Sequence, residues 1–187
     1  MGSVKAVLPV GRSRETIIAR VIRTIQLGGI AQVSVIVGAH AGTVRAAIPA
    51  ASGVAIVEHP GWQAGQLSSL LAGLEAVDDP QLEALMVTPV DVPLVSPATV
   101  TVLVSEWRRT RASIVRPAQG ERHGHPVIFD RTVFADLRAA DPSIGAKAVF
   151  AAHRDRIFNV EVPDAGAFED MDTPEDYARL DLRDSAR

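Results

Sequence analysis

Asp91 is the residue of this sequence best placed to do chemistry. It ends the segment Val87–Asp91, at the carboxyl end of an apolar run with strand character. Ligands of open parallel sheets bind outside the carboxyl ends of the strands, so a carboxylate there could hold Mg²⁺ together with the phosphates of a nucleotide. An Asp that only caps a turn is the alternative, and position alone does not separate the two.

Asp170 and Asp172 form a second acidic site just before the sequence Thr-Pro-Glu-Asp. Side chains two residues apart on an extended segment point to the same side. Beside Asp91, these carboxylates would complete an octahedral Mg²⁺ site with phosphate oxygens and waters. From spacing alone, a role in capping the helix that follows is favoured instead.

A third segment, His59–Leu70, is a loop with glycines and Trp62 that leads into an amphipathic helix. Gly65, Ser68 and Ser69 lie at the start of that helix, where small residues and hydroxyls suit the base and ribose edges of a nucleotide. An ordinary capped helix with Trp62 as a core anchor is the more common arrangement.

The polar loop Arg122–Pro126 contains two histidines, His123 and His125, on either side of Gly124. Two histidines without a third ligand nearby make a weak metal site. A loop that lines the pocket of a second substrate is favoured over a metal site, and a solvated turn is the remaining alternative.

These groups must be positioned by one α/β domain that spans residues 1–187. The chain has 187 residues, no cysteine and a net charge of −3, so it has no disulfide and no broad basic surface for nucleic acid. No apolar run approaches the ~18 residues of a membrane span, and no cleavage signal follows the N-terminus. We expect a cytoplasmic protein that binds neither nucleic acid nor membrane.

Strand-like and helix-like segments alternate along the chain. Expected strands are Val4–Val10, Gln32–Val37, Val54–Glu58, Ala84–Val90, Ala112–Arg116, Pro126–Phe129 and Arg156–Val162. Expected helices begin at Glu15, Gly42, Gly65, Pro97, Thr132, Ile144 and Pro174. Such alternation predicts a three-layer, Rossmann-like fold with a mostly parallel sheet and helices on both faces.

The order of these segments resembles the molybdenum-cofactor nucleotidyltransferase-like family, the cytidylyl- and guanylyltransferase branch of the nucleotidyltransferase superfamily. The resemblance covers nearly the whole chain and rests on Lys5–Val10, Val33–Gly38, the Pro-x-Trp…Gly…Ser-Ser-Leu segment, Val90–Val95, Gly124–Val127 and Asp170–Asp176. The last three motifs together are fairly specific. The resemblance implies a fold of the nucleotide-diphospho-sugar transferase type.

The resemblance also implies roles for individual residues. Lys5 matches the lysine that meets the triphosphate, and Asp91 matches the metal-binding Asp; these two are the expected catalytic residues. Asp172 and then Asp170 match the second metal site, Ser68 and Ser69 match nucleotide contacts, and His123, Gly124 and His125 match the acceptor side. The implied reaction uses Mg²⁺ and moves a nucleoside monophosphate from CTP or GTP to a phosphorylated acceptor, with molybdopterin favoured. A monomer and a homodimer are both compatible.

The sequence departs from the family at its start. The family opens with a strand and a loop of the form Leu-Ala-Ala-Gly-x-Ser-x-Arg-Met-Gly before its lysine, whereas four residues precede Lys5 here. In the preferred alignment, Val4–Val10 moves into the central slot of the missing strand. Gly11, Arg12, Ser13 and Arg14 then form a substitute phosphate loop that leads into the helix at Glu15.

Other interpretations of the same segments remain open. In a second alignment, Val7–Arg14 is itself the opening loop; a true deletion and a misassigned start codon are both compatible with the short N-terminus. One functional alternative is a non-catalytic homologue that binds a nucleotide or a partner. Another keeps the chemistry but uses a sugar phosphate or a phospholactate-type acceptor. A dinucleotide-dependent oxidoreductase is disfavoured, because no Gly-x-Gly-x-x-Gly follows a strand.

Overall fold

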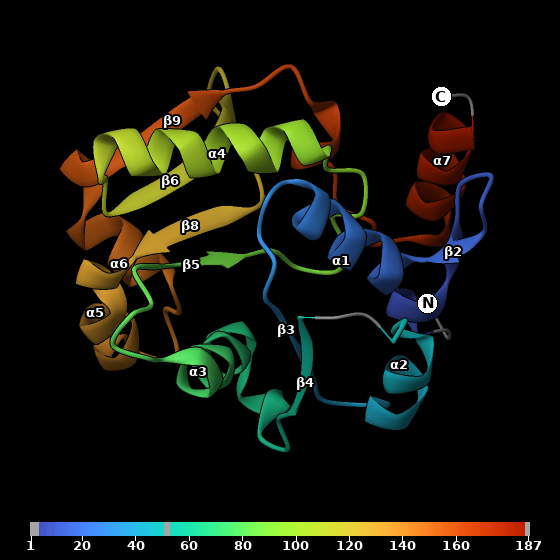
Figure 1. Cartoon of the computed structure of the whole chain (residues 1–187), viewed down its shortest axis with the longest axis horizontal. Coiled ribbons are helices and arrows are strands. Elements are labelled where there is room, and N and C mark those ends of the chain that lie inside the picture. The colour runs from blue at the N-terminus through green and yellow to red at the C-terminus, as the bar shows by residue number, and fades with distance from the viewer. Residues whose placement is uncertain (1–3, 51–52, 186–187) are drawn as a thin grey trace.

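Two sheets form the centre of the computed structural model, which describes residues 4–50 and 53–185 (Figure 1). The strands are β1 Pro9–Val10, β2 Glu15–Thr16, β3 Val33–Val37, β4 Val54–Glu58, β5 Ala84–Val87, β6 Ile114–Gln119, β7 Arg122–His123, β8 Val127–Asp130 and β9 Ile157–Glu161. The helices are α1 Ile17–Leu27, α2 Ala41–Ala47, α3 Gln66–Val77, α4 Pro97–Thr110, α5 Phe134–Ala139, α6 Lys147–Ala152 and α7 Pro174–Ser185. None of these helices combines the length and the apolar character needed to cross a membrane.

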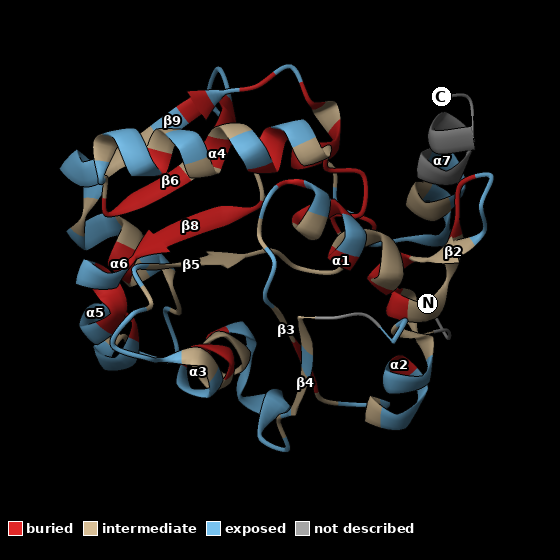
Figure 2. Ribbon diagram, viewed as in Figure 1, coloured by how far each residue is buried: buried red, intermediate tan, exposed pale blue. Residues whose placement is uncertain are grey.

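Helices cover both faces of the larger sheet, which confirms the three-layer α/β architecture. On one face, α4 packs Leu103 and Trp107 against strands β6, β8 and β9. On the other face, Leu74 of α3, Phe134 of α5 and Val149 of α6 share one apolar cluster with the strands. Figure 2 shows the result: β6 and β8 are buried between the two helical layers.

The larger sheet is mixed rather than mostly parallel. The larger sheet has the order β5-β8-β6-β7, with β9 pairing parallel on β6, and β8 runs antiparallel to both β5 and β6. The chain enters β8 from β6 through the short polar loop and β7, and such a reversal needs no crossover helix. The parallel pairs are β3 with β4 and β6 with β9.

The prediction of a central strand over Val4–Val10 is wrong. Residues Lys5–Val7 form a short 3₁₀ helix, η1, and only Pro9–Val10 is extended, in an antiparallel hairpin with Glu15–Thr16. Pro9 has no N–H to donate to a sheet. Packing explains why the rest of this segment is not a strand. Ala6 lies in an apolar cluster with α1, α2 and β3, while Val10 lies in another cluster with Met171.

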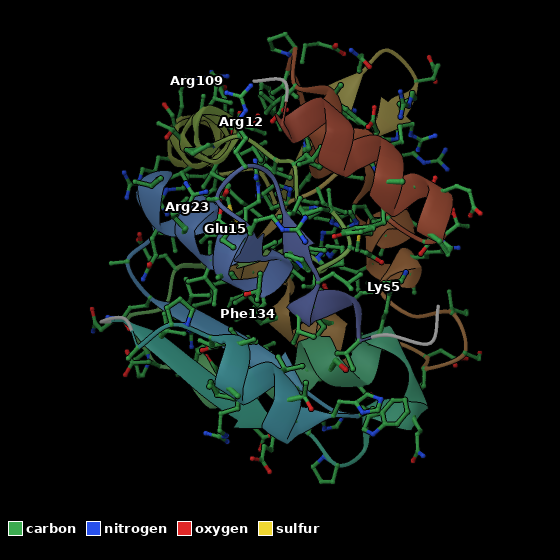
Figure 3. The ribbon with its side chains drawn as sticks, turned by 90° about the vertical axis from the view of Figure 1, so that its right-hand side faces the viewer. Lys5, Arg12, Glu15, Arg23, Arg109 and Phe134 are labelled. Carbon is green, nitrogen blue, oxygen red and sulfur yellow. The ribbon has the colours of Figure 1, made fainter. Side chains whose placement is uncertain are left out.

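The segment Gly11–Arg14 forms the tip of this hairpin, so the predicted loop does not lead directly into a helix. Gly11 and Arg14 both have positive φ, 68° and 54°, as a tight reversal requires. Strand β2 follows, and α1 begins at Ile17 with the Thr16 hydroxyl accepting a hydrogen bond from the Ala19 N–H. Glu15 of β2 makes an ion pair with Arg23 of α1, which ties the hairpin to that helix (Figure 3).

Among the described residues, no strand occupies the slot that the N-terminal segment was predicted to fill. Within residues 4–50 and 53–185, β3 pairs only with β4, and β5 pairs only with β8. One edge of β3 and one edge of β5 therefore lack a strand partner in this part of the chain. The two sheets meet through side chains instead, since Val33 packs in the same cluster as Met86. We call this junction the seam.

We expect Gly28→Ala to destabilise the packing of α1 on α4. A Cβ at Gly28 would lie 2.3 Å from Cγ1 of Val100 and 3.1 Å from the carbonyl oxygen of Pro97. The backbone of Gly28 has φ −75°, which any residue adopts, so the cost comes from overpacking alone, about 1–3 kcal/mol. Urea denaturation measures it. Gly42→Ala is the matched control: its Cβ meets nothing within 4 Å, and alanine inside α2 should stabilise by up to about 1 kcal/mol. Equal stability of the two variants would contradict the prediction.

Candidate nucleotide and metal site

Asp91 lies in a turn beyond the end of β5, which stops at Val87, three residues before the predicted end of that strand. The segment after Asp91 is anchored in the core by Val92 and Leu94, which are 1% and 5% exposed. The carbonyl oxygen of Asp91 accepts a hydrogen bond from the N–H of Met171 at 2.8 Å. Core packing and this bond therefore hold Asp91 beside the second acidic segment.

Met171 positions the two carboxylates on either side of it. Its side chain is 1% exposed and packs with Val10, Ile17 and Leu94, whereas Asp170 and Asp172 are exposed. This alternation agrees with the expectation that the two carboxylates point to one side. The structure thus brings Asp91, Asp170 and Asp172 to one place, although they are far apart in the sequence.

Lys5 reaches the same place from the N-terminus. Its Nζ lies 2.9 Å from Oδ1 of Asp172, with side-chain exposures of 29% and 68%. The hairpin after Lys5 is held by the Tyr177 hydroxyl, which donates to the carbonyl oxygen of Pro9. Helix α7 and the hairpin therefore fix the lysine relative to the acidic segment.

The electrostatics of the site oppose ionisation of Asp91. Burial raises the pKa of the Asp91 carboxyl above its ordinary value, and the nearby charges of Asp170 and Asp172 raise it further, while Lys5 lowers it in part. Three carboxylates thus face one ammonium group. An excess of negative charge at the end of a strand is the condition that a bound cation relieves.

The site fits a divalent cation that is shared with a substrate. Among the described residues, no three His, Asp or Glu side chains form a metal cluster by themselves. Mg²⁺ is usually held by one or two carboxylates, with substrate phosphates and waters as the other ligands. Asp91 and Asp172, with Asp170 beside them, supply that carboxylate number.

Gly124 and His125 pack directly onto the chain that carries the acids. A Cβ at Gly124 would lie 2.1 Å from the carbonyl oxygen of Ala167, and the His125 N–H donates to that oxygen at 2.8 Å. Burial lowers the pKa of His125, while Asp170 and Asp91 raise it in part, and its buried Nδ1 has no hydrogen-bond partner among the described residues. His125 is therefore close to the acids, whereas His123 in β7 is exposed.

The residues predicted to contact the nucleotide at α3 form their own hydrogen-bonded loop. Gly65 has φ 99°, and the Ser68 hydroxyl donates to its carbonyl oxygen at 2.8 Å and lies 3.0 Å from Nε2 of His59. Ser69 is half-buried. In the part of the chain that the structure describes, no hydrogen bond or ion pair joins this loop to Asp91.

Trp62 is 41% exposed, so it is not the core anchor that the sequence suggested. It lies against Gly38 at the end of β3, where a Cβ would be 2.4 Å from Cγ of the indole. Gly38 is thus required by the close approach of the ring, and Trp62 keeps one side open to solvent.

The hairpin tip lies apart from Lys5. Figure 3 shows Arg12 and Lys5 at separate places on this side of the molecule. Arg12 and Ser13 are exposed, and Gly11 is buried. Nucleotide binding by these three residues remains a prediction from the sequence.

Sequence reasoning missed Met171 and Tyr177 as the residues that assemble the site. The polar–apolar–polar order of Asp170-Met171-Asp172 was the available signal for Met171, because it indicates an extended segment with one buried side. No local pattern signals the contact of Tyr177 with Pro9, since it joins the two ends of the chain.

The model of the MobA-like NTP transferase domain matches residues 1–157. The chain belongs to this family. This membership makes the chain one of a group of nucleotidyltransferases.

Solved structures support the same fold. The crystal structure of Rv0371c from Mycobacterium tuberculosis H37Rv is 27% identical, with a TM-score of 0.79, covering 96% of this chain and 90% of that one. A manganese complex of Rv0371C from the same organism is 27% identical, with a TM-score of 0.73 and coverages of 97% and 93%. The molybdopterin-guanine dinucleotide biosynthesis protein A from Archaeoglobus fulgidus is 14% identical, with a TM-score of 0.70 and coverages of 100% and 93%, and shares the fold. No curated protein matches.

Proposed function

We propose that this MobA-like NTP transferase moves a nucleoside monophosphate from a nucleoside triphosphate to a phosphorylated small molecule and releases pyrophosphate. The observation that carries the proposal is the assembly of Asp91, Asp170 and Asp172 opposite Lys5, with the pKa of Asp91 raised. Folding alone gains nothing from such an arrangement, whereas a metal-bound triphosphate would neutralise it.

The proposed chemistry is positioning and charge neutralisation. Asp91 and Asp172 would hold Mg²⁺, with Asp170 beside them, and the cation would offset charge on the phosphates as the acceptor attacks in line. The manganese complex of the Rv0371C structure supports a divalent cation in this family. Lys5 supplies a further positive charge for the triphosphate, and Asp172 holds it towards the site.

The acceptor is proposed to lie on the side of His123, Gly124 and His125. A molybdopterin-type acceptor with CTP or GTP is the favoured pair, and the shared fold of the Archaeoglobus fulgidus protein supports it. A sugar phosphate or a phospholactate-type acid is the alternative acceptor, because it also offers a phosphate group to the same reaction.

Calorimetric titration with CTP, GTP, ATP and UTP, with and without Mg²⁺, tests the proposal. We expect saturable binding of one nucleotide that requires Mg²⁺, at a dissociation constant below about 100 µM, which also names the base. A folded protein that binds no nucleotide in the presence of Mg²⁺ would overturn the proposal.

A non-catalytic, nucleotide- or partner-binding homologue is the second candidate. The open slot at the seam and the hairpin at Gly11–Arg14, where a phosphate loop was predicted, favour it. Release of pyrophosphate on mixing Mg²⁺, the bound nucleotide and candidate acceptors separates the two. Turnover supports the transferase, and nucleotide binding without pyrophosphate from any acceptor class supports the binding protein.

A further inference from the structure

Arg116 is a partly buried cation in the middle of the larger sheet. It lies on β6, in register with Asn159 of β9. Its neighbours on β6 show its direction: Ile114 packs in the cluster with α5 and α6, while Val115 packs in the cluster with α4. Because side chains alternate along a strand, Arg116 points to the same side as Ile114, towards α6.

The guanidinium is fixed on one edge and open on the other. Nε donates to Oδ1 of Asn159 at 2.9 Å, and Cζ lies 5.4 Å from the centre of the Phe150 ring. Across residues 4–50 and 53–185, the terminal nitrogens of Arg116 have no hydrogen-bond partner, and no carboxylate lies within ion-pair distance. Burial lowers the pKa of Arg116, so the fold holds this charge at a cost and leaves it without a counter-ion.

This position adjoins the loop proposed for the acceptor. The Gly124 N–H donates to the carbonyl oxygen of Pro117 at 3.1 Å, and His123 pairs with Ala118. Burial lowers the pKa of His123, and the charge of Arg116 lowers it further. His125, at the other end of the loop, lies near Asp91 and Asp170. The loop therefore runs from the acidic site to Arg116.

We propose that Arg116 binds an oxyanion, a phosphate or a carboxylate, on the acceptor. The identity of the oxyanion as part of an acceptor rests on the proposed function. A planar guanidinium that is oriented by Asn159 and Phe150 presents its free edge in the geometry that recognises two oxygens at once. Neutral Asn159 orients the group without satisfying its charge, which an aspartate at this position would do.

The side-chain Nε–Hε signals of the arginines in the intact ¹⁵N-labelled protein test the proposal. Arg116→Lys identifies the Arg116 signal by its loss, so the titration itself uses the wild-type chain. Inorganic phosphate and acetate are added in separate titrations at constant ionic strength. We expect the Arg116 signal to shift saturably with at least one of them, at a dissociation constant of about 10 mM or below. The signals of the exposed Arg154 and Arg156, for which the structure gives no ion pair, should shift weakly and without saturation.

The outcomes separate this proposal from the proposed function. Saturation by phosphate alone assigns a phosphate site, and equal saturation by acetate assigns a carboxylate site. An Arg116 signal that responds like Arg154 and Arg156 overturns the inference. Titration of Arg116→Gln with the nucleotide and Mg²⁺ is the second arm, in which we expect the wild-type affinity within about 2-fold. Failure of nucleotide binding in the wild type, with Arg116 still saturable, overturns the transferase and leaves the oxyanion site standing.

Discussion

Replacing Asp91 with Asn is expected to raise the melting temperature at pH 7 while Mg²⁺-dependent nucleotide binding falls about 100-fold or more, a loss of roughly 3 kcal/mol. Burial and two neighbouring carboxylates raise the pKa of Asp91 in the folded chain. Asn keeps the shape and removes the charge, so it relieves repulsion in the folded state and removes a proposed metal ligand. A purely structural Asp91 would give a less stable variant.

The pH dependence of this effect has a defined sign. The folded-state pKa of Asp91 lies above its unfolded value, so in the pH range between these two values the unfolded chain gives up the proton more readily. The wild type therefore loses stability as pH rises from about 4 towards the raised pKa, and Asp91→Asn does not. Thermal unfolding of both proteins between pH 3 and pH 7 should show equal stability at the acid end. The difference in stability between the two should then grow as the pH rises.

Asp141→Asn is the matched control, because the pKa shift of Asp141 and the expected change in stability both have the opposite sign. Hydrogen bonds from the hydroxyl and the N–H of Ser143, at 2.7 and 2.8 Å, lower the pKa of the exposed Asp141. Its charge therefore stabilises the fold at pH 7, and this contribution is lost as pH falls through its pKa. We expect Asp141→Asn to be slightly less stable at pH 7 and to bind nucleotide like the wild type. A nucleotide-binding defect in this variant would show that binding responds to general charge rather than to Asp91.

Gly124→Ala is expected to destabilise the chain by about 2–4 kcal/mol. The new Cβ would lie 2.1 Å from the carbonyl oxygen of Ala167 and 2.8 Å from Cδ1 of Phe168. The first of these atoms is backbone, and Ala167 is only 1% exposed, so the contact is not relieved by a side-chain rotation. The loop must move instead, which breaks the hydrogen bond from His125 to Ala167.

Urea denaturation measures this loss, and His123→Ala supplies the comparison. His123 directly precedes Gly124 in the chain but is exposed, so its truncation should change stability by no more than about 0.5 kcal/mol. If Gly124→Ala were as stable as His123→Ala, the close packing of the loop on Ala167 would be wrong.

Most of the helices and longer strands, and the acidic pair, were predictable because their signals are local. The sequence pattern placed the strand Val54–Glu58 at its observed bounds, and it placed the start of the helix at Pro97, where α4 begins. Spacing also indicated that Asp170 and Asp172 share a side. Family resemblance, rather than spacing, is what joined them to Asp91.

What could not be predicted depends on contacts between distant segments. The run Val4–Val10 is apolar and β-branched, so it has strand character, but Ala6 and Val10 pack into two different clusters and bend the chain between them. Strand direction is not encoded in periodicity, so the antiparallel β8 was missed. Arg116 looked like the polar end of a strand, because its counter-ion-free environment arises only when β9 and α6 pack beside it.

The seam has a consequence for how tightly any ligand can bind. Lys5 and Asp91 both lie close to this junction, because Ala6 packs with β3 in the same apolar cluster that Val90 packs against. In the described chain, no ladder of backbone hydrogen bonds joins β3 to β5. The unit of β3, β4 and α2 can therefore move away from the larger sheet without breaking a backbone hydrogen bond of that sheet. We expect amide exchange in this unit to be faster than in β6 and β8. A ligand that contacts both Lys5 and Asp91 would restrict such opening, and part of its binding free energy would be used to hold the β3–β4 unit and the larger sheet in one arrangement.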